Sequence, residues 1–241
     1  MIIDVTNPAT FPTEIENLVY NYIDELPSDI ISQLHDIENG VIYRSPKNYF
    51  DKIGAPSLYD SILPLFKDYS LRCYHATRVL DEKTILNNGL LLNDWNNYAV
   101  ILREALELTA ISEADIEKAI TLAKQEQERK TQDIPPAICF YASPFMDNYL
   151  EMFCCNVGGE IARWALQDKM PEVFEKLKHI GTPVVVECAL PLDDIGLISI
   201  EEIVYSYTEK KLWNRNYSIE FDGRIKRNIK PSEVIRIIHS K

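Results

Sequence analysis

The sequence lacks long apolar runs and the leader segment of an exported protein. It contains no stretch of about 18 apolar residues, so we expect no membrane-spanning helix. Its first residues, MIIDVTNPATFPTEIEN, have neither a basic segment nor an apolar one, so we expect no signal peptide. These absences predict a cytoplasmic protein with no membrane partner.

Several motifs of common enzyme classes are also absent. There is no P-loop, no GxGxxG and no HExxH, so kinase, dehydrogenase and zincin functions lack support. The chain has 5 cysteines but no CxxC pair, so we expect no zinc or other metal site. An odd number of cysteines among apolar residues, without a secretion signal, predicts five reduced thiols.

Basic residues are few relative to acidic ones. The chain has 25 Lys and Arg against 37 Asp and Glu, a formal net charge of -12. Such a surface repels phosphate backbones, which disfavours broad nucleic-acid binding but leaves room for a local basic pocket. Hydrophobic residues make up 46% of the 241 residues, enough to bury the core of one large domain with or without a helical attachment.

The first 70 residues are mostly helical in pattern. Apolar residues recur at helical spacing from Ile15 to Ile23, and Pro12 and Thr13 provide a start. Pro27 to Asp29 break this helix and begin a second one that continues through Leu34. A connection follows over 40–57, and a third helix is expected over 57–66.

From Leu71 the pattern becomes mixed. Asp81 is expected to cap a helix over 82–88, and Gly89 to end it in the left-handed conformation. Gly158-Gly159 is a weak point in the helical pattern of 145–167, and Asp222-Gly223 is a hairpin turn signal. Further helices are predicted over 97–130, where the second begins near Ser112, and 171–179. Strands are predicted over 71–76, 137–142, 183–190, 200–207, 216–221, 224–229 and 234–238.

These elements predict an α+β protein. The helical N-terminal region covers 1–70, and a sheet-containing domain covers 71–241. A helical insertion interrupts that domain at about 94–134, between the first two predicted strands.

Four short motifs follow one another in the second region. The first is Tyr74-His75-Ala76-Thr77, followed by a helix and Gly89-Leu90. The second is Phe140-Tyr141-Ala142-Ser143. The third is Val186-Glu187-Cys188-Ala189-Leu190, and the fourth joins Ser218-Ile219-Glu220-Phe221 to Pro231-Ser232-Glu233-Val234-Ile235.

The residue types in these motifs suit cleavage of a nicotinamide from a ribose. That reaction creates a flat, cationic, oxocarbenium-like centre. An aromatic ring can hold the planar leaving group, and a carboxylate near the ribose can stabilise the positive charge. A histidine at a strand end can fix the dinucleotide, so His75, Tyr141 and Glu220 would meet these needs if they shared one cleft.

The chain resembles the ADP-ribosyltransferase superfamily, on the branch of diphtheria toxin and the poly(ADP-ribose) polymerases. The resemblance covers roughly 71–241 and implies a split mixed or antiparallel sheet that binds NAD as a substrate. His75 would hold the ribose, Tyr141 would stack on nicotinamide and Glu220 would hold the nicotinamide ribose. The resemblance adds Ala76, Thr77, Arg78, Ser143 and Tyr149 as further cofactor-binding residues, and it makes the strand of Glu187 structural rather than catalytic. Glu187 itself is expected to be a strand-surface carboxylate.

Two departures and one alternative accompany the resemblance. Ala76 stands where the family usually has glycine, and Tyr149 lies nearer to Tyr141 than the second family tyrosine does. The catalytic glutamate could instead be Glu201 or Glu202. Glu220 is preferred because it lies 33 positions beyond Glu187, which leaves room for an intervening strand.

The implied function is NAD-dependent mono-ADP-ribosylation, with release of nicotinamide. The acceptor is not identified by the sequence, although a protein fits the acidic composition better than a nucleic acid does. Two alternatives are an inactive relative that binds a partner protein, and an NAD-using RNA 2'-phosphotransferase, which would need more basic residues near the motifs. Arg78 could face a phosphate of the dinucleotide or be an ordinary surface arginine.

Overall fold

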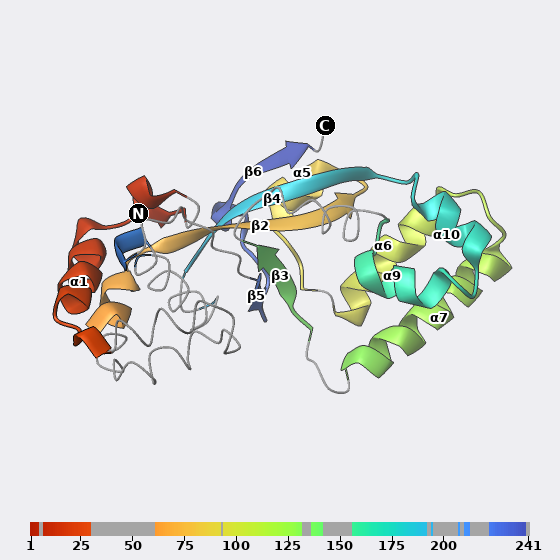
Figure 1. Ribbon diagram of the computed structural model, residues 1–241. Coiled ribbons are helices and arrows are strands. Elements are labelled where there is room, and N and C mark those ends of the chain that lie inside the picture. The colour runs from red at the N-terminus through yellow and green to blue at the C-terminus, as the bar shows by residue number, and fades with distance from the viewer. Residues whose placement is uncertain are drawn as a thin grey trace. The chain divides into compact units, whose positions relative to one another are not determined.

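The chain is a mixture of helices and antiparallel strands, in agreement with the predicted α+β class (Figure 1). The computed structural model describes residues 1–4, 7–29, 61–92, 94–131, 136–141, 156–191, 194, 207, 210–212 and 222–239. In this part of the chain no helix has both the length and the apolar character needed to cross a membrane.

The chain divides into two compact units, which are described separately. One unit combines Met1–Arg72 with Leu190–Gly223, and the other combines Cys73–Ala189 with Arg224–Lys241. The domain boundary predicted at 70/71 thus lies two residues from the first division. The segment 190–223, which the sequence placed in the second region, is grouped with the N-terminal residues.

The N-terminal unit contains the first predicted helix. Helix α1 spans Thr13–Asp24 and begins after Pro12, as the sequence predicts. It buries Ile15, Val19 and Ile23 on one face, which is the expected result of apolar residues at helical spacing. The unit also holds a 3-10 turn at Pro8–Thr10, a second 3-10 turn η3 at Leu63–Phe66, and strand β1 at Ile2–Ile3.

Tyr207 corrects one predicted strand. The sequence predicts a strand ending at Tyr207, but this residue is helical, and residues 200–206 lie outside the described part. Its ring is 1% exposed and meets Phe11 edge-on, with ring centroids 5.2 Å apart. Burial between distant parts of the unit, which a local pattern does not reveal, thus decides the conformation at this position.

The second unit is built around the strand on which the first motif lies. The described strands follow the order β5-β3-β2-β4-β6, and β1 pairs with the start of β2. Figure 1 shows β2, β4 and β6 running beside one another. Strand β2 pairs antiparallel with β3, with Tyr74 opposite Tyr141. The strands are β2 at Ser70–Val79, β3 at Ile138–Tyr141, β4 at Thr182–Pro191, β5 at Asp222–Ile225 and β6 at Val234–His239.

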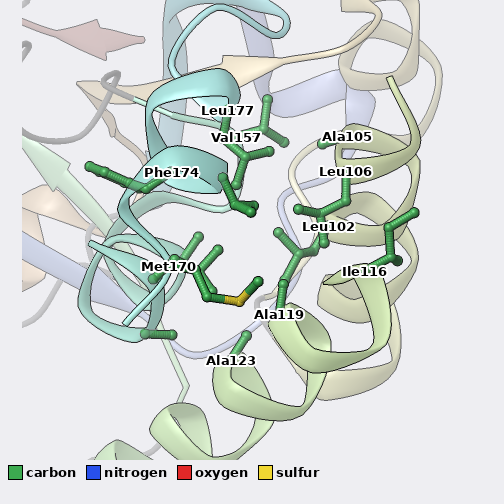
Figure 2. Close-up of a cluster of buried hydrophobic side chains, with 14 of the residues drawn as sticks. Leu102, Ala105, Leu106, Ile116, Ala119, Ala123, Val157, Met170, Phe174 and Leu177 are labelled. Carbon is green, nitrogen blue, oxygen red and sulfur yellow. The ribbon is translucent and has the colours of Figure 1, made fainter. Parts of the chain in front are cut away.

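A helical cluster forms the other half of the second unit. Helix α7 packs against α6 and α9, and α10 packs against α9 and α6. Their shared core is apolar and includes Leu102, Leu106 and Leu177 (Figure 2), each with no exposed surface. The helices are α6 at Trp95–Glu107, α7 at Glu113–Thr131, α9 at Gly159–Leu166 and α10 at Pro171–Leu177.

Helix α5, at Glu82–Asn88, has the predicted bounds and cap. The Asp81 side chain accepts a hydrogen bond from the Lys83 backbone N–H at 3.0 Å. Gly89 has φ 75° as expected, but its ψ of -158° is extended rather than left-handed helical. The reason is an antiparallel bridge between Leu90 and Ile229, which draws the chain away from the helix at this residue.

The predicted hairpin turn at Asp222-Gly223 is wrong. Both residues belong to strand β5, which lies next to β3 in the sheet. An Asp-Gly pair favours a turn only locally, and pairing within the sheet overrides that preference here. The strand predicted over 224–229 accordingly ends at Ile225, and only Ile229 forms a bridge beyond it.

Glu187 is buried, which corrects its prediction as a strand-surface carboxylate. The residue is 1% exposed, and its Oε2 accepts a hydrogen bond from Arg236 Nε at 2.6 Å. The two residues lie opposite each other in the β4–β6 pairing. A carboxylate at a core position is tolerated when a cation of the next strand reaches it.

Cys73, Cys139 and Cys188 are thiols, as predicted. Cys154 and Cys155 lie outside the described residues. The helix predicted from Ile30, the connection over 40–57, the start of the helix over 57–66 and the strand over 216–221 also lie outside them. Residues 61–66 of that helix are described and helical, and they end in η3.

Candidate functional site

The second unit contains a cavity of about 460 Å³ between the sheet and the helical cluster. Residues 75–79 of β2 form one wall, and residues 136–139, which lead into β3, extend it. The cluster contributes residues of α6, the end of α7 and the start of α9. Volumes of about 300 to 1,000 Å³ are typical of small-molecule sites, so this cavity can hold a ligand.

His75 lines this cavity and is held by the neighbouring strand. Its Nδ1 lies 2.8 Å from the carbonyl oxygen of Cys139. A carbonyl can only accept a hydrogen bond, so Nδ1 carries the proton. Burial lowers the pKa of His75 below its ordinary value, against the opposing effect of this hydrogen bond. The ring is therefore neutral at pH 7, and Nε2 is an acceptor.

Tyr141 does not share a face of the sheet with His75. Tyr141 stands opposite Tyr74, and successive side chains of a strand point to opposite faces. The ring next to His75 is that of Phe140, at 5.7 Å between centroids. Phe140 has no exposed surface, so it supports His75 from within the core.

The other residues of the first motif lie along the same cavity wall. Ala76 and Thr77 line it, and Ala76 is 8% exposed. Arg78 also lines it, and its Nε donates a hydrogen bond to the carbonyl oxygen of Ile180 at 2.7 Å. This bond fixes the half-buried side chain of Arg78 at the cavity, so Arg78 is not the ordinary surface arginine that the sequence left as an alternative.

The remaining predicted site residues lie outside the described part of the chain. These are Glu220, Ser143, Tyr149 and the alternative glutamates Glu201 and Glu202.

Sequence reasoning missed the residues that the helical cluster brings to the cavity. Tyr98 of α6, Lys130 of α7 and Glu160 and Trp164 of α9 all line it. Lys130 Nζ lies 3.8 Å from the centroid of the Trp164 ring, a cation–π contact. The sequence gives no signal for this convergence, because each residue fits an ordinary amphipathic helix.

Glu160 is a half-buried carboxylate at this end of the cavity. Burial raises the pKa of Glu160, although the charges of Lys130, Arg163 and Arg224 lower it. These cations are therefore close enough to act on the carboxylate electrostatically.

The cavity is much less acidic than the whole chain. Among the described residues, three cations line it, Arg78, Lys130 and Arg224, against three carboxylates, Asp81, Glu104 and Glu160. Asp81 is engaged in capping α5. The formal charges of these described lining residues cancel, whereas the chain as a whole carries -12. An anionic ligand is therefore repelled less at these residues than the net charge of the chain suggests.

Within the described ranges, no group of three or more His, Cys, Asp or Glu residues is placed to hold a metal ion. Comparisons with protein-family models, curated proteins and solved structures found no match to the chain.

Proposed function

We propose that the protein is an NAD-dependent mono-ADP-ribosyltransferase of the cytoplasm, with NAD bound in the cavity beside His75. The observation that carries this proposal is the state of His75. The ring is neutral, its Nδ1–H is committed to Cys139, and it lines a cavity of ligand size. Its Nε2 is therefore a fixed acceptor for a ribose hydroxyl, as the resemblance of the Tyr74–Thr77 motif implies.

Holding the ribose is the first requirement of the proposed reaction. Loss of nicotinamide leaves positive charge on the ribose, so a neutral His75 opposes this charge less than an imidazolium would. Orientation of the reacting bond by fixed groups lowers the barrier without any chemistry by the histidine itself. Glu220 is the proposed carboxylate that stabilises the cation. Thr77 and Arg78 would contact the dinucleotide from β2, where both line the cavity.

Tyr141, which the sequence predicts to stack on nicotinamide, is not part of this proposal. Tyr141 points to the face opposite His75, so the proposal rests on His75 and not on Tyr141. Tyr98 and Trp164 are the aromatic residues that line the cavity in the described part of the chain. The acceptor of ADP-ribose is proposed to be a protein, because the net charge of -12 disfavours nucleic acid.

The test compares His75→Ala with His179→Ala. His179 is an exposed histidine away from the cavity, so its substitution controls for the loss of an imidazole. NAD binding is measured by calorimetry, and nicotinamide release is followed by chromatography. We expect His75→Ala to weaken NAD binding about tenfold or more, the usual consequence of losing a buried hydrogen bond to a ligand.

The control variant should behave as the wild type in both assays. Wild-type protein that neither binds NAD nor releases nicotinamide would contradict the proposal and favour the alternative of a partner-binding relative. Equal NAD binding by His75→Ala and wild type would contradict the assigned role of His75.

A further inference from the structure

The first turn of α9 forms a wall of the cavity and has no side-chain cap. Gly158 is the N-cap residue, with φ 87° and ψ 1°, and as a glycine it provides no side-chain cap. Gly158, Gly159, Glu160 and Ile161 all line the cavity. The first N–H groups of a helix have no partners within the helix, and the helix dipole adds partial positive charge there. Such an end favours an anion.

A buried hydroxyl without an acceptor lies at the same place. Tyr98 is 2% exposed, and in the described part of the chain its hydroxyl proton has no acceptor, although the backbone N–H of Ala162 donates toward its oxygen. It lies beside the first turn of α9, since a Cβ atom on Gly158 would be 2.9 Å from it. Burial raises the pKa of Tyr98, so the hydroxyl keeps its proton. A buried donor that lines a cavity and lacks an acceptor indicates that a ligand supplies one.

Two cations complete the surroundings. Lys130 and Arg224 line the cavity, and both act electrostatically on Glu160 in the first turn of α9. Lys130 is also held over the Trp164 ring. Ammonium and guanidinium groups, an uncapped helix end and a phenol hydroxyl are all hydrogen-bond donors, and phosphate oxygens are acceptors that match them.

The apolar part of the cavity indicates what carries the phosphate. Leu91, Ile101 and Trp164 line it and are 39%, 39% and 40% exposed, although large apolar side chains are usually buried. An aromatic base can cover such a surface. A ligand with an aromatic base and a charged phosphate group would therefore fill both parts of the cavity.

We propose that the N-terminus of α9, together with Tyr98, Lys130 and Arg224, binds the diphosphate of a nucleotide. The inference deepens the proposed function, and it rests on that function only for the link to NAD. Glu160 competes with the diphosphate for the same cations, so its carboxylate limits the affinity.

Gly159 offers a substitution with a matched control. Its φ is 54°, and a Cβ atom there would have no neighbour within 4 Å. Asn and Asp tolerate this conformation better than most residues. Gly159→Asp therefore introduces a charge at the helix end, and Gly159→Asn introduces the same shape without the charge.

Calorimetry with ADP, adenosine and pyrophosphate tests the site. We expect ADP to bind wild type at least tenfold more tightly than adenosine, and Gly159→Asp to abolish this advantage while Gly159→Asn keeps it. Lys130→Gln should weaken ADP binding about tenfold, whereas Lys124→Gln, an exposed control on the same helix, should not. Glu160→Gln should strengthen ADP binding, because a competing carboxylate is removed.

Tyr98→Phe separates a ligand role from a structural one. The melting temperature without ligand should hardly fall, because the hydroxyl donates no hydrogen bond within the described part of the chain, while the shift caused by ADP should shrink. A clear fall in the ligand-free melting temperature would contradict the inference. Tight binding of pyrophosphate alone, with no gain from the base, would contradict the nucleotide and leave a simple phosphate site.

The outcomes distinguish this inference from the proposed function. Binding of ADP that follows these variants, without nicotinamide release from NAD, would overturn only the transferase. Equal binding of ADP and adenosine, or equal binding of ADP by Gly159→Asp and Gly159→Asn, would overturn the diphosphate site even if NAD is turned over.

Discussion

Gly89 tests whether the wall of the cavity is built as described. A Cβ atom on this residue would lie 1.8 Å from the carbonyl oxygen of Ile229, and φ 75° with ψ -158° is a conformation adopted almost only by glycine. Gly89→Ala therefore imposes about 2 kcal/mol of backbone strain. It also displaces the Leu90–Ile229 bridge, whose hydrogen bonds are 3.1 and 2.9 Å long. At about 1 kcal/mol for each bond, the total cost is about 4 kcal/mol.

Gly159→Ala is the control for this substitution. Gly159 also has positive φ, at 54°, but a Cβ atom there has no neighbour within 4 Å. Its expected cost is about 1 kcal/mol, from the left-handed conformation alone. Both variants gain the same stability from a less flexible unfolded chain, so this effect cancels between them.

Urea denaturation followed by circular dichroism measures the difference. A gap of about 3 kcal/mol corresponds to about 1 M in midpoint for a slope near 3 kcal/mol/M. Gly89→Ala should therefore unfold at clearly lower urea than Gly159→Ala. Equal midpoints for the two variants would refute the close approach of Gly89 to Ile229 and the constraint that it places on the cavity wall.

Four further predictions concern titration, thiols and catalysis. The pKa of His75 is lowered in the folded protein, so protons bind the unfolded chain more strongly as pH falls below about 6.5. The free energy of unfolding should therefore decrease as pH falls through that window. The same pH series with His75→Gln should lack this contribution. Burial raises the pKa of Cys188 to about 12 and that of Cys73 well above its ordinary value. Among these described cysteines, native alkylation followed by mass spectrometry should therefore label the half-buried Cys139 before Cys73 and Cys188; early labelling of Cys73 or Cys188 would contradict their burial. Intact mass under non-reducing conditions should show five thiols, and a stable disulfide would contradict the proposed cytoplasmic location. Glu220→Gln should lower the rate of nicotinamide release about a hundredfold or more while NAD binding survives. Full activity of this variant would contradict the role of Glu220 and favour Glu201 or Glu202 as the catalytic glutamate.

Local signals predicted the parts of the fold that depend on neighbouring residues. Helix α5 has its predicted bounds because Asp81 caps it and Gly89 ends it within the same short segment. The apolar spacing of α1 likewise produces the expected buried face. These elements follow from interactions over a few residues, which a sequence displays directly.

Long-range packing decided the features that the sequence did not predict. Arg236 stabilises the buried Glu187 from a strand 49 positions later, so the local pattern indicated a surface residue. Sheet pairing places Asp222 and Gly223 in a strand despite their turn signal. The candidate site also combines local and long-range features. His75 was predicted from its motif, whereas Tyr98 lines the cavity only because α6 packs against other helices.

The central claim is that NAD is bound and cleaved at the cavity beside His75. Its most direct test is incubation of the protein and cell lysate with NAD labelled in the adenosine part, following nicotinamide release and label transfer together. We predict that wild type does both, that a protein becomes labelled, and that His75→Ala does neither while His179→Ala matches the wild type. Absence of both nicotinamide release and label transfer with wild type, or undiminished transfer by His75→Ala, would contradict the account.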